Sequence, residues 1–299
     1  MAESFADRPR GSAPNARRRG FWAFCALIVL FILAVLVDPL SFSASAEHTD
    51  VGRARTNEHA DLVTAPELLA PVPSKVSAGD LERLIAKGEP IYCGAGTKPL
   101  VALTFDDGPG VNTQATIDLL QARGMTATFF TVGKLYGATP GWGKLLATEA
   151  SFGAVGDHTW DHVPVRGLSA GRLADEILRT RRAARRLSGR PVFLFRPPLG
   201  ARDRTLDRYL SDHGMLQVMW SVESGDSQGA SRRKIYRTIR EHLSPGDIVL
   251  LHEGRGTTQH ALPAILDLIE ARGYRTVTVP QLLAMDPPSN EQLRSHSCP

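Results

Sequence analysis

The chain has 299 residues, of which 42% are hydrophobic and 22% charged, with 27 Gly and 20 Pro. This composition excludes a collagen-like or wholly disordered chain and leaves room for one large domain or two small ones. The formal net charge is +4, but residues 1–20 alone carry five Arg against Glu3 and Asp7. Because nucleic-acid binding needs a basic surface on the folded domain, the charge balance argues against a nucleic-acid partner.

An apolar segment near the N-terminus predicts entry into a membrane. Residues 21–37 include no polar side chain and follow the arginines at 17–19. Their number, 17, fits either a signal peptide or a retained anchor, and Ala44-Ser45-Ala46 offers a cleavage pattern, so both alternatives stay open. The arginines keep residues 1–20 in the cytoplasm as a basic leader. We therefore expect a membrane segment at 21–42 and an extracytoplasmic protein, anchored or secreted.

The next part of the chain is predicted to be a linker. Residues 43–97 begin rich in Ser, Ala, Thr and Pro and later show a capping box at Ser77 and Asp80, which predicts an extracellular linker with a short helix. Cys93 and Cys298 lie beyond the membrane segment. An oxidising exterior permits a disulfide between them, although free thiols remain the alternative.

From residue 98 to 287, β-rich runs alternate with helical ones. Strands are predicted at 100–105, 126–132, 152–157, 192–196, 215–222, 247–252 and 274–279. Helices are predicted near 113–123, 140–150, 169–187, 203–213, 231–243 and 258–272, followed by a C-terminal tail at 288–299. The alternation predicts an α/β fold in which helices cover a parallel sheet, open or closed as a barrel. Ligands of such sheets bind at the C-terminal ends of the strands.

Candidate metal ligands stand at two predicted strand ends. Asp106 and Asp107 end the first strand, and His158 and His162 follow the third. Alone, the acids fit a turn and the histidines fit ordinary surface or core positions. Together, one carboxylate and two imidazoles form a three-ligand set that leaves positions open for water and substrate, as in catalytic metal sites. Further polar groups end later strands, namely Arg196, Glu223, Asp226 and His252.

These motifs make the sequence similar to the polysaccharide deacetylases with a NodB homology domain, carbohydrate esterase family 4, over about residues 98–283. The matched motifs are T-F-D-D-G-P at 104–109, His158-Thr159 with His162, Arg196 with Pro198 and Gly200, and Leu250 with His252. The resemblance implies a deformed (β/α) barrel with about seven parallel strands in a domain spanning 98–287. It also implies a divalent metal, commonly zinc, with Co²⁺ or another divalent ion as the alternative.

The resemblance also assigns roles to residues. It implies that Asp106 is the catalytic base, that His252 is the catalytic acid, and that Asp107, His158 and His162 bind the metal.

Other residues are predicted to assist. Arg196 pairs with the base, Asp226 orients the acid and keeps it protonated, and the backbone N–H of Leu199 stabilises the oxyanion. Leu250 is predicted to contact the substrate. The fourth motif departs from the family pattern, because Glu223 replaces an Asp and Ser227 an aromatic residue, and Leu199 also replaces an aromatic. We therefore expect weaker sugar stacking or a different sugar.

The predicted function is metal-dependent removal of N-acetyl groups from an extracytoplasmic glycan such as peptidoglycan or a chitin-like polymer, by a monomer. The alternatives are an O-acetyl polysaccharide esterase and a non-catalytic carbohydrate-binding wall module. Residues 172–190 carry seven Arg against Asp175 and Glu176. A solvated helix face explains this segment, and attraction to an anionic wall polymer is the alternative.

Overall fold

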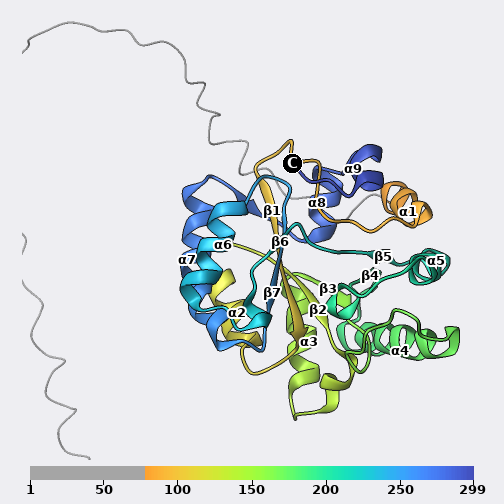
Figure 1. Cartoon of the computed structure of the whole chain (residues 1–299). Coiled ribbons are helices and arrows are strands. Elements are labelled where there is room, and N and C mark those ends of the chain that lie inside the picture. The colour runs from red at the N-terminus through yellow and green to blue at the C-terminus, as the bar shows by residue number, and fades with distance from the viewer. Residues whose placement is uncertain (1–77) are drawn as a thin grey trace, which may run out of the picture. The chain divides into compact units, whose positions relative to one another are not determined.

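A computed structural model describes residues 78–299, and its centre is one parallel sheet (Figure 1). The sheet of the described residues has eight strands in the order β5-β4-β3-β2-β1-β7-β6, with β8 also paired to β1, and every pairing is parallel. The strands are β1 (Leu100–Gly108), β2 (Thr128–Thr131), β3 (Ala154–Asp157), β4 (Leu194–Phe195), β5 (Leu216–Gln217), β6 (Val222–Glu223), β7 (Ile248–His252) and β8 (Arg275–Thr276).

The sheet curls into an incomplete barrel, because its two edge strands are consecutive in sequence. Only residues 218–221 separate β5 from β6, which lie at opposite ends of the strand order. The prediction of one strand at 215–222 is therefore wrong. Within this range, the backbone carbonyl groups of Val218 and Met219 accept hydrogen bonds from the Arg196 side chain, at 3.1 and 2.8 Å. The chain then crosses to β7, where the backbone N–H of Ile248 donates to the Ser221 hydroxyl. The apolar sequence of residues 215–222 cannot reveal this interruption, because the buried side chain of Arg196, which follows another strand, causes it.

Helices cover the outside of the sheet. They are α1 (Ala78–Lys87), α2 (Thr113–Gln121), α3 (Trp142–Phe152), α4 (Ala170–Ser188), α5 (Arg204–Asp212), α6 (Arg232–His242), α7 (Gly256–Ala271), α8 (Val279–Met285) and α9 (Asn290–Ser295). The first seven match the predicted helices within a few residues. The last two were not predicted, and each begins with a capping box, at Thr278 and Ser289.

Alternate residues of β1 face two different cores. Val101, Leu103 and Phe105 pack with residues of α2, α6 and α7, whereas Leu100 and Ala102 pack in a second cluster that includes α8. This follows from the two-residue period of a strand. Asp106 shares the second face, so its carboxylate lies among buried side chains at the end of the strand.

The C-terminus is joined covalently to the start of the sheet. Cys93 and Cys298 form a disulfide. The sequence left a bridge and free thiols open, and the structure has the bridge. Within residues 78–299, no helix is both long and apolar enough to cross a bilayer. The predicted leader and membrane segment, residues 1–42, lie outside the described residues.

Candidate active site

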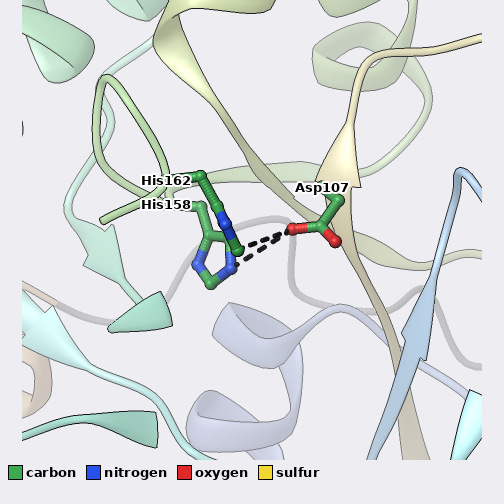
Figure 2. A group of neighbouring side chains, drawn as sticks. All are labelled: Asp107, His158 and His162. Carbon is green, nitrogen blue, oxygen red and sulfur yellow. Dashed lines mark ion pairs between the residues drawn. The ribbon is translucent and has the colours of Figure 1, made fainter. Parts of the chain in front are cut away.

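Asp107, His158 and His162 converge at the C-terminal end of the sheet, where the sequence places a metal site. Figure 2 shows the three side chains pointing toward one another. The Oδ1 atom of Asp107 lies 3.0 Å from Nε2 of His162 and 3.6 Å from Nε2 of His158. One potential ligand atom from each residue lies within 4.8 Å of the others. The end of β1 and the segment after β3 supply these groups, as predicted.

The donor set fits a cation. Nδ1 of His158 lies 2.8 Å from the carbonyl oxygen of Arg196 and must donate to it, so Nε2 carries a lone pair. That lone pair faces Oδ1 of Asp107, a buried oxygen that accepts no hydrogen bond from the described residues. Facing acceptors repel unless a positive charge lies between them.

The electrostatics also favour the protonation states in which these residues bind a metal, a neutral imidazole and an ionised carboxylate. Burial holds the pKa of His158 below its ordinary value, which favours the neutral imidazole that binds metals. Burial alone would raise the pKa of Asp107, but its contacts with the imidazoles of His162, at 3.0 Å, and of His158 outweigh burial and lower the pKa to about 2. Asp107 is thus an ionised carboxylate at neutral pH.

Asp106 is held by a buried guanidinium. Nη1 of Arg196, which is 0% exposed, donates to Oδ1 of Asp106 at 2.7 Å and to the Thr104 hydroxyl at 2.8 Å. The remaining guanidinium donors bind the backbone carbonyls between β5 and β6, and the group stacks on Phe130 at 4.1 Å. Oδ2 of Asp106 lies 3.7 Å from Nε2 of His158, beside the metal-ligand cluster. A fully paired Arg fixes the carboxylate in place.

His252 and Asp226 form a second pair across the site. Nδ1 of His252 donates to Oδ1 of Asp226 at 2.7 Å, which leaves Nε2 as the other reactive atom of the ring. Oδ2 of Asp226 accepts from the His252 backbone N–H at 2.7 Å and from the Thr258 hydroxyl at 2.5 Å. Burial alone would lower the pKa of His252, but the hydrogen bond and charge of Asp226 outweigh it and raise the pKa. His252 is therefore suited to carry a proton.

The backbone is strained at this site. Among the described non-glycine residues, five have positive φ, and four of these belong to the motifs: Asp107, Thr159, His162 and Leu199. Such conformations cost on the order of 1–3 kcal/mol each and concentrate at functional sites. Leu199 follows β4 in a short helical turn, and its side chain is 78% exposed. The turn thus presents an apolar residue to solvent.

The predicted residues otherwise take these positions. Leu250 is buried on β7, paired in register with Thr104 and Glu223. Glu223 is exposed, and its Oε1 accepts from the Gln228 side chain at 2.7 Å. Ser227, where an aromatic groove wall was expected, lies in the turn after β6.

Sequence reasoning missed a buried acid pair next to this site. Glu149 and Glu253 are both buried, and their neighbouring carboxyl groups interact. Glu253 also contacts the Thr113 hydroxyl and donates its backbone N–H to the carbonyl oxygen of Asp106 at 3.0 Å. Burial and the neighbouring acid raise the pKa of Glu149, and burial raises that of Glu253 to about 7. In the sequence, the only indication of this pair was that Glu149 falls on the apolar face of α3, between Leu146 and Ala150.

Known proteins are similar to this chain in sequence. The family model for polysaccharide deacetylase matches residues 94–218. A peptidoglycan-N-acetylglucosamine deacetylase of Bacillus cereus is 33% identical over 190 residues, covering 62% of this chain and 88% of that protein. PgdA, the peptidoglycan-N-acetylglucosamine deacetylase of Listeria monocytogenes, is 31% identical over 189 residues, covering 63% of this chain and only 40% of the longer protein.

A solved structure gives the same fold. A mutant of Bacillus anthracis BA3943, a pseudoenzyme of carbohydrate esterase family 4 with restored activity, has a TM-score of 0.61 and 26% identity, covering 67% of this chain and 72% of that one. Fold and site together define an α/β protein with a candidate three-ligand metal site. The chain belongs to the polysaccharide deacetylase family, which confirms the predicted resemblance.

Proposed function

We propose that this protein is a metal-dependent hydrolase that removes N-acetyl groups from an extracytoplasmic polysaccharide, peptidoglycan or a chitin-like glycan. One observation carries the proposal: the candidate cation-binding cluster of Asp107, His158 and His162 lies beside the carboxylate of Asp106, and His252 pairs with Asp106 in register on the neighbouring strand. Amide hydrolysis needs an activated water, a stabilised oxyanion and protonation of the leaving amine.

Asp106 is assigned as the general base. Asp107, His158 and His162 would hold a divalent cation, with zinc the first choice for two imidazoles and a carboxylate, and it would polarise the acetyl carbonyl and acidify a water. Asp106 then accepts one proton from that water. Its hydrogen bond from Arg196 holds the carboxylate in place for this role.

His252 is assigned as the general acid. Asp226 holds one ring nitrogen of His252, so the other can deliver a proton to the departing nitrogen of the sugar. The backbone N–H of Leu199 is assigned to the oxyanion, a role that does not depend on its side chain, and such a donor contributes about 3 kcal/mol in comparable sites. Leu250 is assigned to the substrate-contacting wall.

The substrate class rests on the relatives and on the compartment. Both sequence relatives are named for peptidoglycan N-acetylglucosamine, which makes an N-acetylated wall glycan the first candidate here. The disulfide between Cys93 and Cys298 supports an oxidising compartment, as the predicted export requires. With Leu199 and Ser227 in place of aromatic residues, the groove should hold the sugar with less stacking than relatives that carry aromatics there.

The test is acetate release by the full chain from N-acetylated peptidoglycan, chitin oligomers and O-acetylated xylan, with and without a chelator. We expect release from an N-acetylated glycan, loss on chelation and recovery when a divalent ion is returned. Asp106→Asn should lower kcat by 10²-fold or more, because a base contributes roughly that factor. Release from the ester substrate alone, or from none of them with metal bound, would replace this function by the esterase or the binding module.

A further inference from the structure

Arginine side chains cover the outward face of α4. The buried face of this helix includes Leu173, Ile177 and Ala184. The opposite face carries a set of exposed arginines at spacings of one to four residues, which places them along one side of the helix. We call this set the arginine stripe: Arg179, Arg182, Arg185, Arg186 and, just beyond the helix, Arg190.

The stripe lacks compensating acids. Within residues 78–299, no carboxylate oxygen lies within 4.0 Å of any of the five guanidinium groups, whereas Arg172 at the start of the helix contacts Asp161, Asp175 and Glu176. Residues 172–190 hold seven Arg against Asp175 and Glu176, a net +5, which exceeds the +4 of the entire chain. Ordinary solvated surfaces carry positive and negative side chains next to one another. The small net charge of the whole chain therefore conceals a strongly basic helix face.

This arrangement costs the helix stability. Arg182 and Arg186 are four residues apart, and like charges at that spacing destabilise a helix by roughly 0.2–0.5 kcal/mol. Replacing one of them by Glu would relieve the repulsion. A function in binding explains why the face is basic in spite of this cost.

The stripe starts at the metal-binding segment. Cζ of Arg179 lies 3.7 Å from the ring centre of Trp160, which stands between the ligands His158 and His162. The backbone N–H groups of Trp160 and Asp161 donate to the buried carboxylate of Glu176, at 2.9 and 2.8 Å. Glu176 of α4 therefore anchors the loop that bears His158 and His162. The arginine stripe continues along the same helix from Arg179 toward its C-terminal end.

We propose that the arginine stripe binds acidic groups of the polymer whose N-acetyl groups the site removes, so that the substrate class is an acid-bearing glycan. This inference rests on the proposed function. At 1.5 Å per residue the stripe extends roughly 16 Å from Arg179 to Arg190, which suits an extended polyanion better than a single ion. The recognised chemistry is carboxylate or phosphate, to which guanidinium groups bind in bidentate fashion.

A polymer fits the stripe better than a lipid surface. Helices that bind membrane surfaces insert an apolar face, but the apolar face of α4 is buried against the sheet. Among the described residues the exposed large hydrophobic side chains are Val111, Leu187 and Leu199, and only Leu187 belongs to α4.

The test compares two charge-reversed double variants of the full chain. Arg182→Glu places a Glu four residues before Arg186 within α4, which favours the helix, and Arg190→Glu lies beyond the helix end. The double variant should therefore keep the fold while the stripe loses its charge. Arg233→Glu with Arg237→Glu makes the same change on α6, where both arginines are exposed and have no carboxylate within 4.0 Å among the described residues.

The readouts are KM and kcat on acid-bearing peptidoglycan fragments and on neutral chitin oligomers at two salt concentrations. We expect the stripe variant to raise KM for the acidic fragments about tenfold at low salt, with kcat and the neutral substrate unchanged. The wild-type KM should rise with salt and that of the variant should not, because salt screens exposed charges. Polyglutamate and polyphosphate as competitors distinguish carboxylate from phosphate recognition.

Co-sedimentation with insoluble peptidoglycan measures the stripe without turnover. If no glycan loses acetate but the stripe variant alone fails to sediment, the proposed function fails and the binding surface stands. Equal changes in both variants would overturn the inference, because any loss of positive charge would then suffice. Loss of binding only to phosphatidylglycerol vesicles would also overturn it, in favour of a membrane surface.

Discussion

At the residue scale, pairs of charged groups set the chemistry of the site. Arg196 fixes the carboxylate of Asp106, and Asp226 fixes the imidazole of His252 and helps to raise its pKa. The sequence could predict these residues because each stands at a strand end. It could not predict Glu149, because the contact of α3 with Glu253 depends on the tertiary packing.

Asp226→Asn should lower the pKa of His252, because it removes the negative charge that raises it. The general acid then loses its proton at lower pH, so the alkaline limb of the kcat profile should move toward acid, with kcat lower by roughly tenfold or more. The pH dependence of kcat measures this. An unmoved alkaline limb would show that another group is the acid.

The Glu149–Glu253 pair predicts a pH dependence of stability. Folding raises the pKa of Glu253 from its ordinary value near 4.5 to about 7, so this contribution to stability is present below pH 4.5 and is lost as pH rises through 7. Glu149→Gln should flatten this decline, because an amide donates to the remaining carboxylate. Urea unfolding between pH 5 and 8 measures it, with the exposed Glu82→Gln as control. Parallel curves for wild type and Glu149→Gln would refute the assignment.

At the element scale, the end of β1 is packed too tightly to accept a side chain. A Cβ atom on Gly108 would lie 1.9 Å from Oε1 of Glu253, whereas one on Gly110 would meet nothing within 4 Å. Gly108 therefore lets β1 and β7 bring Asp107 and His252 to the same edge. The helix and strand pattern was predictable from periodicity, but this close approach between two strand ends was not.

Gly108→Ala should destabilise the fold by about 1–3 kcal/mol, the usual cost of overpacking. It should also lower kcat, because Asp107 precedes the altered position. Gly110→Ala is the matched control and should change neither quantity by much. Thermal unfolding and acetate release measure both. A fully stable and active Gly108→Ala protein would show that Glu253 can move away without cost.

At the scale of the whole molecule, most of the fold and the site could be predicted from the sequence. Apolar strands alternate with amphipathic helices, and five motifs fall where strands end, which fixes both the sheet and the edge that bears the site. The split between β5 and β6 could not be predicted, since the buried Arg196 side chain takes up the carbonyl groups that link them. The net charge of the chain does not show the arginine stripe, because acids elsewhere cancel it, but the seven Arg at residues 172–190 could be read from the sequence.

The Cys93–Cys298 disulfide closes almost the whole described chain into one loop, with 205 residues of sequence separation. Replacing both cysteines by Ser should lower the free energy of unfolding by about 2–4 kcal/mol, since the unfolded chain gains freedom. The metal site lies at the other end of β1, so acetate release at 25 °C should persist. Chemical denaturation of the oxidised, reduced and double-Ser forms measures this. Equal stability of all three would contradict the bridge.

The central claim is that one divalent cation lies among Asp107, His158 and His162. The most direct measurement is the metal content of purified, active full-length protein by elemental mass spectrometry, beside the same measurement on Asp107→Ala. We predict about one divalent ion per chain in the wild type, and loss of both ion and acetate release in the variant. Active protein without stoichiometric metal, or an Asp107→Ala protein that keeps its ion, would contradict the account.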